Sequence, residues 1–150
     1  MKSWMLVFLV LMLAVALPAS AHHPFTPYYD GSKLEVLTGV VVELQITNPH
    51  VVLIVDVSGP EGRKGRWGFE GLPPHTFSNN GVDLKKKLQP GTQIVISGWP
   101  AKDPKAHVFS GRDITFADKS TMTFGPTPEG ADGWRCDGPC PYKYPEVPSR

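Results

Sequence analysis

Alternating apolar and polar residues predict that most of the chain folds as short β-strands. The segments between them are rich in Gly, Pro, Asn and Asp, which is typical of tight turns. The strongest turn signals are Asn48-Pro49 and Pro90-Gly91. The pattern predicts five strands and a short edge strand, over residues 34–46, 50–57, 65–70, 93–99, 107–116 and 121–124.

The first predicted strand is the longest and has a clear period-two pattern. The residues that fall on one of its faces are Val36, Thr38, Val40, Val42 and Leu44. Gly39 interrupts this run, and we expect a β-bulge there that lets the strand bend. A long, bent first strand is what a small barrel needs in order to close.

Residues 72–87 have no strand pattern, and Pro73 and Pro74 favour the first turn of a short helix there. The order is therefore three strands, a short helical segment and two further strands. This order matches the five-stranded Greek-key barrel called the OB-fold. We predict an all-β, OB-like barrel over residues 34–124. A small antiparallel sandwich is the alternative, because the period-two pattern does not separate the two folds.

The first 21 residues have the pattern of a secretory signal peptide. Lys2 precedes an apolar run from Trp4 to Leu17, and Ala19-x-Ala21 matches a cleavage site. The run is shorter than the roughly 20 residues that a membrane-spanning helix needs, and an uncleaved anchor is the alternative. We therefore expect a periplasmic or secreted protein of residues 22–150, with no membrane attachment after cleavage.

Two segments flank the predicted barrel. Residues 22–33 are rich in proline and aromatic residues and should form an extended N-terminal arm. We expect Phe25 or Tyr28 to pin this arm to the domain. Residues 125–150 should form an irregular tail that is rich in Pro and Gly.

The charge of the mature chain is balanced. The full chain has 15 Lys and Arg against 14 Asp and Glu, and cleavage removes Lys2 alone among them. No field of one sign then attracts nucleic acid or an anionic membrane, so neither is an expected partner. The two cysteines, Cys136 and Cys140, lie in the tail, and an oxidising compartment favours a disulfide between them.

Cleavage after Ala21 would give a mature chain that begins with His22-His23. The α-amine and ring nitrogen of an N-terminal histidine can hold one metal ion as a chelate, which an internal histidine cannot do. His50 and His107 fall in the two loops that flank the ligand face of an OB-fold. Nitrogen donors in a plane suit Cu(II). We therefore predict a transition-metal site, for copper above all, with the ligands His22, His23, His50 and His107.

Structural roles also explain these histidines, because a His-His start can serve only as a soluble terminus and His50 can cap a turn. The alternative function is a metal-free structural or protein-interaction module with no cofactor. Its proline-rich tail would dock on an aromatic groove of an unknown protein partner. No Gly-x-Ser-x-Gly, phosphate-binding loop or His-Glu-x-x-His motif occurs, so no catalytic residue is predicted. An oxidative copper enzyme would need the same histidines and an open coordination position.

Three motifs resemble those of a family of small exported bacterial proteins of unknown function. They are Ala21-His22-His23-Pro24-Phe25, Thr47-Asn48-Pro49-His50 and Gly98-Trp99-Pro100-Ala101-Lys102-Asp103. The resemblance covers about residues 20–124 and implies export and a small β domain, with no established activity. The chain departs from the family pattern at Pro24, at Val52 and over residues 73–77, and its tail looks like an addition.

Overall fold

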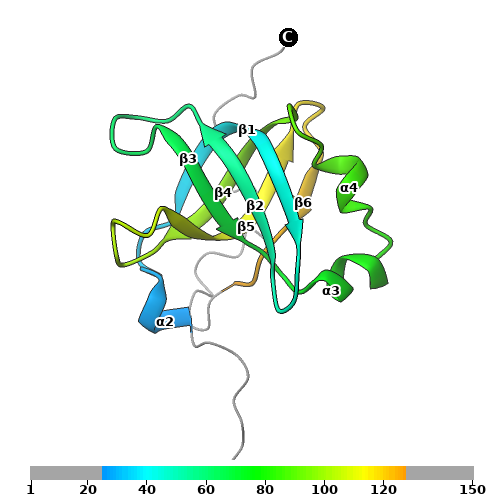
Figure 1. The fold of residues 1–150 in the computed structure, drawn as a ribbon, viewed down its shortest axis with the longest axis horizontal. Helices are drawn as coiled ribbons and strands as arrows, with labels where there is room; N and C mark the ends of the chain where they lie inside the picture. The colour runs from blue at the N-terminus through cyan, green and yellow to red at the C-terminus, as the bar shows by residue number, and fades with distance from the viewer. Residues whose placement is uncertain (1–24, 128–150) are drawn as a thin grey trace, which may run out of the picture.

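The computed structural model describes residues 25–127, whose strands wrap around one core (Figure 1). The predicted signal peptide, His22, His23 and the cysteine-bearing tail lie outside the described residues. Each predicted strand begins and ends within one residue of its predicted position. Within residues 25–127, no helix is long and apolar enough to cross a membrane. The elements are α2 (Phe25–Tyr28), β1 (Glu35–Ile46), β2 (Val51–Val57), β3 (Gly65–Glu70), α3 (Pro74–Asn79), α4 (Leu84–Lys87), β4 (Gln93–Pro100), β5 (Val108–Phe116) and β6 (Thr121–Thr123).

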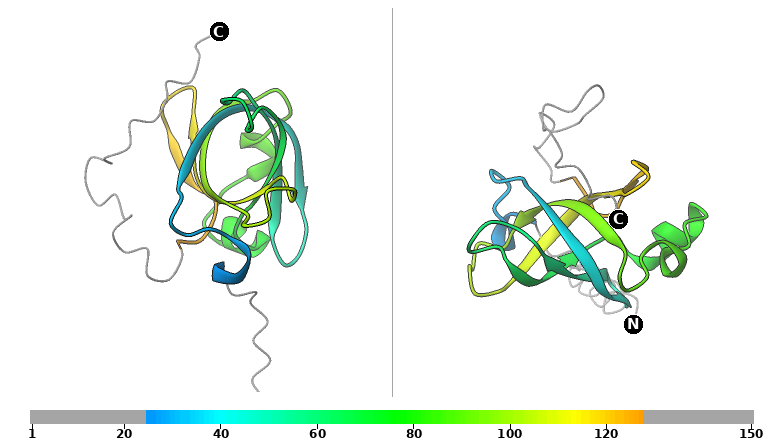
Figure 2. Two further views of the ribbon diagram at one scale, coloured as in Figure 1. Left: turned by 90° about the vertical axis from the view of Figure 1, so that its left-hand side faces the viewer. Right: turned by 90° about the horizontal axis from the view of Figure 1, so that it is seen from above.

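The strands form one continuous sheet that closes on itself as a barrel. Neighbouring strands run antiparallel in the order β3-β2-β1-β4-β5-β6. A parallel pairing of β3 with β5 closes the ring, with Gly68 opposite Val108 and Glu70 opposite Ser110. The left view of Figure 2 looks into this ring. The predicted five-stranded OB-like barrel is confirmed, a two-sheet sandwich is excluded by the closure, and β6 extends the barrel as an additional strand.

Aliphatic and aromatic side chains fill the barrel. Its largest fully buried members include Phe69 of β3 and Phe109 of β5, whose rings stack with centroids 5.1 Å apart. These two strands form the parallel closure, so the stacked rings pack directly behind it. Removing this apolar surface from water is the main favourable term in holding the ring closed.

The core-facing residues of β1 are odd-numbered in the first part of the strand and even-numbered after a bulge. Leu37 and Val41 are almost fully buried, so the even-numbered residues between them lie on the outer face. A bulge between Val41 and Glu43 then shifts the pairing with β2 by one residue. Beyond it, Leu44 packs against the core. The bulge thus lets one long strand contribute core residues at both ends while it bends around the barrel.

Two strand glycines allow backbones to approach closely. A Cβ at Gly39 would lie 2.5 Å from Cγ1 of Val55, and a Cβ at Gly98 would lie 2.5 Å from the carbonyl oxygen of Ser110. The predicted bulge at Gly39 is wrong in position, because Gly39 is regularly paired with both neighbouring strands. Its role is to make room for β2.

The segment between β3 and β4 is helical, as predicted. α3 begins at Pro74, which a first helical turn tolerates because the missing N–H has no intrahelical partner there. The Asp83 carboxylate accepts a hydrogen bond from the Lys86 N–H at 3.1 Å and caps α4. Phe77 of α3 and Leu84 of α4 are buried and join the barrel core. Figure 1 shows the two helices together on one side of the barrel.

The Gly98→Ala substitution should destabilise the barrel by about 1–3 kcal/mol, because a backbone carbonyl must move to admit the methyl group. Gly68→Ala is the matched control. Its Cβ would meet only side-chain atoms at 3.7–3.8 Å, so its effect should stay within about 0.5 kcal/mol. Urea unfolding measures both free energies. Equal unfolding midpoints for the two variants would contradict the close approach at Gly98.

Candidate functional site

The N-terminal arm pairs with the end of β4. Tyr29 forms an isolated antiparallel bridge with Ala101. The Asp30 N–H donates to the Pro100 carbonyl at 2.9 Å. Pro100 and Ala101 both belong to the motif over residues 98–103, so this motif provides the backbone that pairs with the arm.

The described part of the arm begins as a helical turn, which corrects the prediction that residues 22–33 are extended. Phe25–Tyr28 form this turn, and the Tyr29 N–H donates to the Phe25 carbonyl at 3.0 Å. The rings of Phe25 and Tyr29 lie side by side, with centroids 5.4 Å apart. The Phe25 ring also meets the buried Trp99 edge-on at 5.5 Å. Contacts with β4 therefore decide the local conformation, and Phe25 pins the arm as expected.

Three side chains join the arm to the barrel: Tyr29, His50 and Glu70. The Tyr29 hydroxyl donates to Oε2 of Glu70. The other carboxylate oxygen, Oε1, lies 3.3 Å from Nδ1 of His50. His50 directly precedes β2 and Glu70 ends β3, and the antiparallel pairing of Val52 with Glu70 brings the two together. The arm and the Asn-Pro-His turn thus meet at one carboxylate.

Burial sets the protonation of the tyrosine in this cluster. Burial, reinforced by the hydrogen bond to Glu70, raises the pKa of Tyr29 well above its ordinary value. Tyr29 therefore acts as a neutral hydroxyl donor, and the carboxylate accepts from it. The side chains of His50 and Glu70 are 28% and 36% exposed, so a ligand can reach them from solvent.

The contact with Glu70 determines which nitrogen of His50 is available for a ligand. When Nδ1 carries the proton and donates it to the carboxylate, Nε2 keeps a free lone pair. Metal-binding histidines are commonly oriented by a carboxylate in this way. Within residues 25–127, no three His, Cys, Asp or Glu side chains lie close enough together to hold a metal ion. A metal at His50 would therefore need ligands from beyond this range.

His107 occupies a different environment from His50. Its ring stacks on Trp67 at 4.5 Å with an interplanar angle of 11°, and its backbone φ of 49° lies in the left-handed region. The Arg63 guanidinium lies 5.1 Å from the centre of the same Trp67 ring and forms two hydrogen bonds with Glu35, at 2.6 and 2.7 Å. Trp67 points into the barrel, whereas Glu70 lies on the opposite face of β3. The structure thus does not bring His107 into the cluster of Tyr29, His50 and Glu70.

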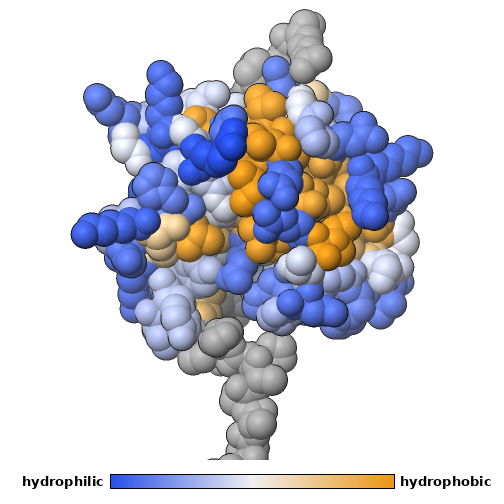
Figure 3. All heavy atoms as spheres, viewed as in Figure 1, coloured by the Kyte–Doolittle hydropathy of each residue, from blue (hydrophilic) through white to orange (hydrophobic). Residues whose placement is uncertain are grey.

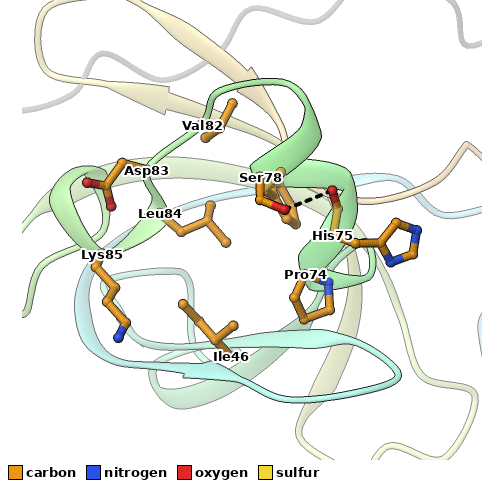
Figure 4. A pocket seen from close by; sticks show the side chains of 9 residues that line it. Ile46, Pro74, His75, Ser78, Val82, Asp83, Leu84 and Lys85 are labelled. Atoms are coloured by element: carbon orange, nitrogen blue, oxygen red, sulfur yellow. Dashed lines mark hydrogen bonds between the residues drawn. The ribbon is translucent and has the colours of Figure 1, made fainter.

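A separate groove lies between the end of β1 and the helices α3 and α4 (Figure 4). It has a volume of about 300 Å³, and Ile46, Phe77 and Leu84 line it. Ile46 is 40% exposed there. His75, which was not predicted as a ligand, contributes to the wall of the groove, and Figure 4 shows its ring pointing away from the groove. The groove is therefore suited to an apolar group.

The outer face of β1 and β2 also carries an apolar area, which Figure 3 shows over these strands together with polar side chains. On β2, the half-buried Val52 and Ile54 alternate with buried residues and so lie on this outer face. Val52 is opposite Glu70 in the register of β2 and β3, and directly opposed residues share a face. The cluster around Glu70 therefore borders an aliphatic surface.

Fold and site together define a small closed β-barrel whose N-terminal arm is held at a carboxylate beside a loop histidine. The chain belongs to the DUF6152 family, a family of unknown function whose model matches residues 10–110. This finding confirms the prediction of a family of unknown function, and all three motifs lie within the matched residues. A comparison with curated proteins finds no match.

Sequence reasoning missed Tyr29 and Glu70 as members of the site. Glu70 is an ordinary charged residue at the end of a strand, and Tyr29 is one of several aromatic residues in the arm. Their contact joins residues that are 41 positions apart, so no local pattern reports it. The sequence contained only a weak signal for Glu70: an acidic residue on β3 lies opposite the strand that follows the Asn-Pro-His turn.

Asp30, at the end of the arm, offers a test of how this segment is held. Hydrogen bonds from Ser32, followed by that from Lys33, lower the pKa of Asp30 to about 2. Ser32→Ala removes the hydroxyl donor at 2.6 Å, so the pKa should rise toward its ordinary value of 3.8. Because the folded-state pKa is lowered, this carboxylate stabilises the protein above pH 3.8 and loses that effect as the pH falls through about 2.

Carboxyl-carbon NMR titration measures this pKa. Asp118 is an internal control, because hydrogen bonds from the hydroxyl and the backbone N–H of Ser120 lower the pKa of Asp118 in the same way. Ser32→Ala should leave the Asp118 titration unchanged. An unchanged Asp30 titration in this variant would mean that the turn at Ser32 does not form in solution.

Proposed function

We propose that the protein is an exported β-barrel module that binds a transition metal, Cu(II) above all, through its mature N-terminal histidines and His50. One observation carries the proposal. Tyr29 of the arm and His50 of the Asn-Pro-His turn share the carboxylate of Glu70. The part of the chain that leads to the predicted mature N-terminus is therefore anchored next to a histidine with an available ring nitrogen.

The tether between this anchor and the predicted N-terminus is short. An extended chain spans at most about 3.6 Å per residue, so His22 lies within roughly 11 Å of Phe25. Phe25 is one helical turn from Tyr29, and its ring packs against both Tyr29 and Trp99. This length supports a site in which the N-terminus and His50 act together.

The proposed ligands are nitrogen atoms. The α-amine and the imidazole of His22 form a chelate, and Nε2 of His50 adds a third donor. His23 allows a second mode of metal binding. Its donors would be the His23 imidazole, the α-amine and the backbone amide nitrogen between these two groups. Such sets favour Cu(II), which heads the divalent affinity order. His107 is left out of the proposed set because its ring is stacked on Trp67.

Calorimetry with Cu(II) on the mature protein, residues 22–150, tests the proposal. We expect one ion to bind with a dissociation constant below about 1 μM, and His22→Ala or His50→Ala to weaken binding by about tenfold or more. His75→Ala is the control and should bind as the wild type does. Because imidazoles must be neutral to bind a metal, affinity should fall below about pH 6.

A protein that retains Ala21 provides a sharper control, because its α-amine belongs to alanine and the His22 chelate cannot form. It should bind copper clearly more weakly than the protein that begins at His22. Micromolar or weaker binding that is unchanged in His22→Ala would overturn the proposal. The metal-free interaction module would then be the remaining hypothesis.

A further inference from the structure

We infer that Glu70 and Tyr29 are positioning residues of the proposed copper site: Glu70 holds the His50 ring with Nε2 toward the metal, and Tyr29 fixes Glu70. The inference rests on the proposed function and adds two residues to it. Neither residue is assigned as a metal ligand. Each acts through the residue that it contacts.

The backbone of Glu70 is fixed on both sides. It pairs with Val52 of β2 and with Ser110 of β5, at the place where the barrel closes. Its side chain is 36% exposed, so the backbone alone leaves the carboxylate free to rotate. Contacts of the two carboxylate oxygens must therefore set its orientation.

Those contacts divide the two oxygens between two partners. Oε2 accepts the Tyr29 hydroxyl, and Oε1 lies 3.3 Å from Nδ1 of His50. Tyr29 is itself held by its bridge to Ala101 and by the ring of Phe25. The carboxylate is thus fixed in a plane in which one oxygen is directed at the imidazole.

A carboxylate at Nδ1 has two effects on a histidine ligand. It selects the tautomer with the proton on Nδ1, which leaves Nε2 unprotonated for the metal. It also fixes the orientation of the ring, and loss of such a partner typically weakens metal binding by about 10–100-fold. Because Tyr29 belongs to the arm that leads to His22, docking of the arm and orientation of His50 are coupled through one hydrogen bond.

Copper titrations of Glu70→Ala, Glu70→Gln and Tyr29→Phe in the mature protein test this inference. We expect Glu70→Ala to bind Cu(II) about 10–100-fold more weakly, and Glu70→Gln to recover part of the loss because its amide oxygen still accepts from Nδ1. Tyr29→Phe should weaken binding severalfold. Glu43→Gln on the exposed part of β1 and Tyr28→Phe are matched controls and should keep wild-type affinity.

A second measurement needs no copper. Nitrogen-15 NMR of the imidazole in the metal-free protein, at a pH where His50 is neutral, should show the proton on Nδ1. In Glu70→Ala the population with the proton on Nε2 should rise, in a spectrum that otherwise remains that of the folded barrel.

The outcomes separate this inference from the proposed function. If His50→Ala loses copper affinity while Glu70→Ala keeps it, Glu70 does not position the ligand and only the inference fails. A proton on Nε2 in the wild-type protein would overturn it as well. If the wild-type protein binds no copper, the proposed function and the inference fall together.

Discussion

The carboxylate of Glu70 connects three parts of the chain that are distant in sequence. One oxygen accepts from Tyr29, 41 positions away, and the other lies beside His50, 20 positions away. The arm, the turn between β1 and β2 and the end of β3 are thereby held in one place. Without this shared acceptor, the arm would be held by its contacts with β4 alone, and His50 would lack the partner that orients its ring.

Closure of the barrel makes this arrangement possible. Ser110 of β5 pairs with Glu70 on one side and with Trp99 on the other. The arm bridges to Ala101 just beyond Trp99, and the Tyr29 hydroxyl reaches Glu70 on the far side of β5. The parallel pairing of β3 with β5 therefore sets the distance between the docked arm and Glu70. One tyrosine side chain spans this distance. An open sheet would leave the two anchoring points unconnected.

The strands and their order could be predicted because their cause is local. Burial of alternate residues gives the period of two, and Gly and Pro mark the turns, so the boundaries agree with the structure. The bulge near Val41 could not be placed, since register depends on the partner strand. The helical turn at Phe25 depends on Trp99, and the stacking of His107 on Trp67 depends on how loop and barrel meet. The site required the same long-range contacts, which explains why His50 was chosen from the sequence while Glu70 and Tyr29 were not.

The central claim is that the N-terminus and His50 act at one place, and paramagnetic broadening by Cu(II) tests it most directly. In NMR spectra of the mature protein, one equivalent of Cu(II) broadens the signals of nuclei close to the bound ion. The account predicts that the signals of Tyr29, His50 and Glu70 disappear while those of Trp67 and His107 persist. Broadening centred on Trp67 and His107, or confined to the first residues of the arm, would contradict it.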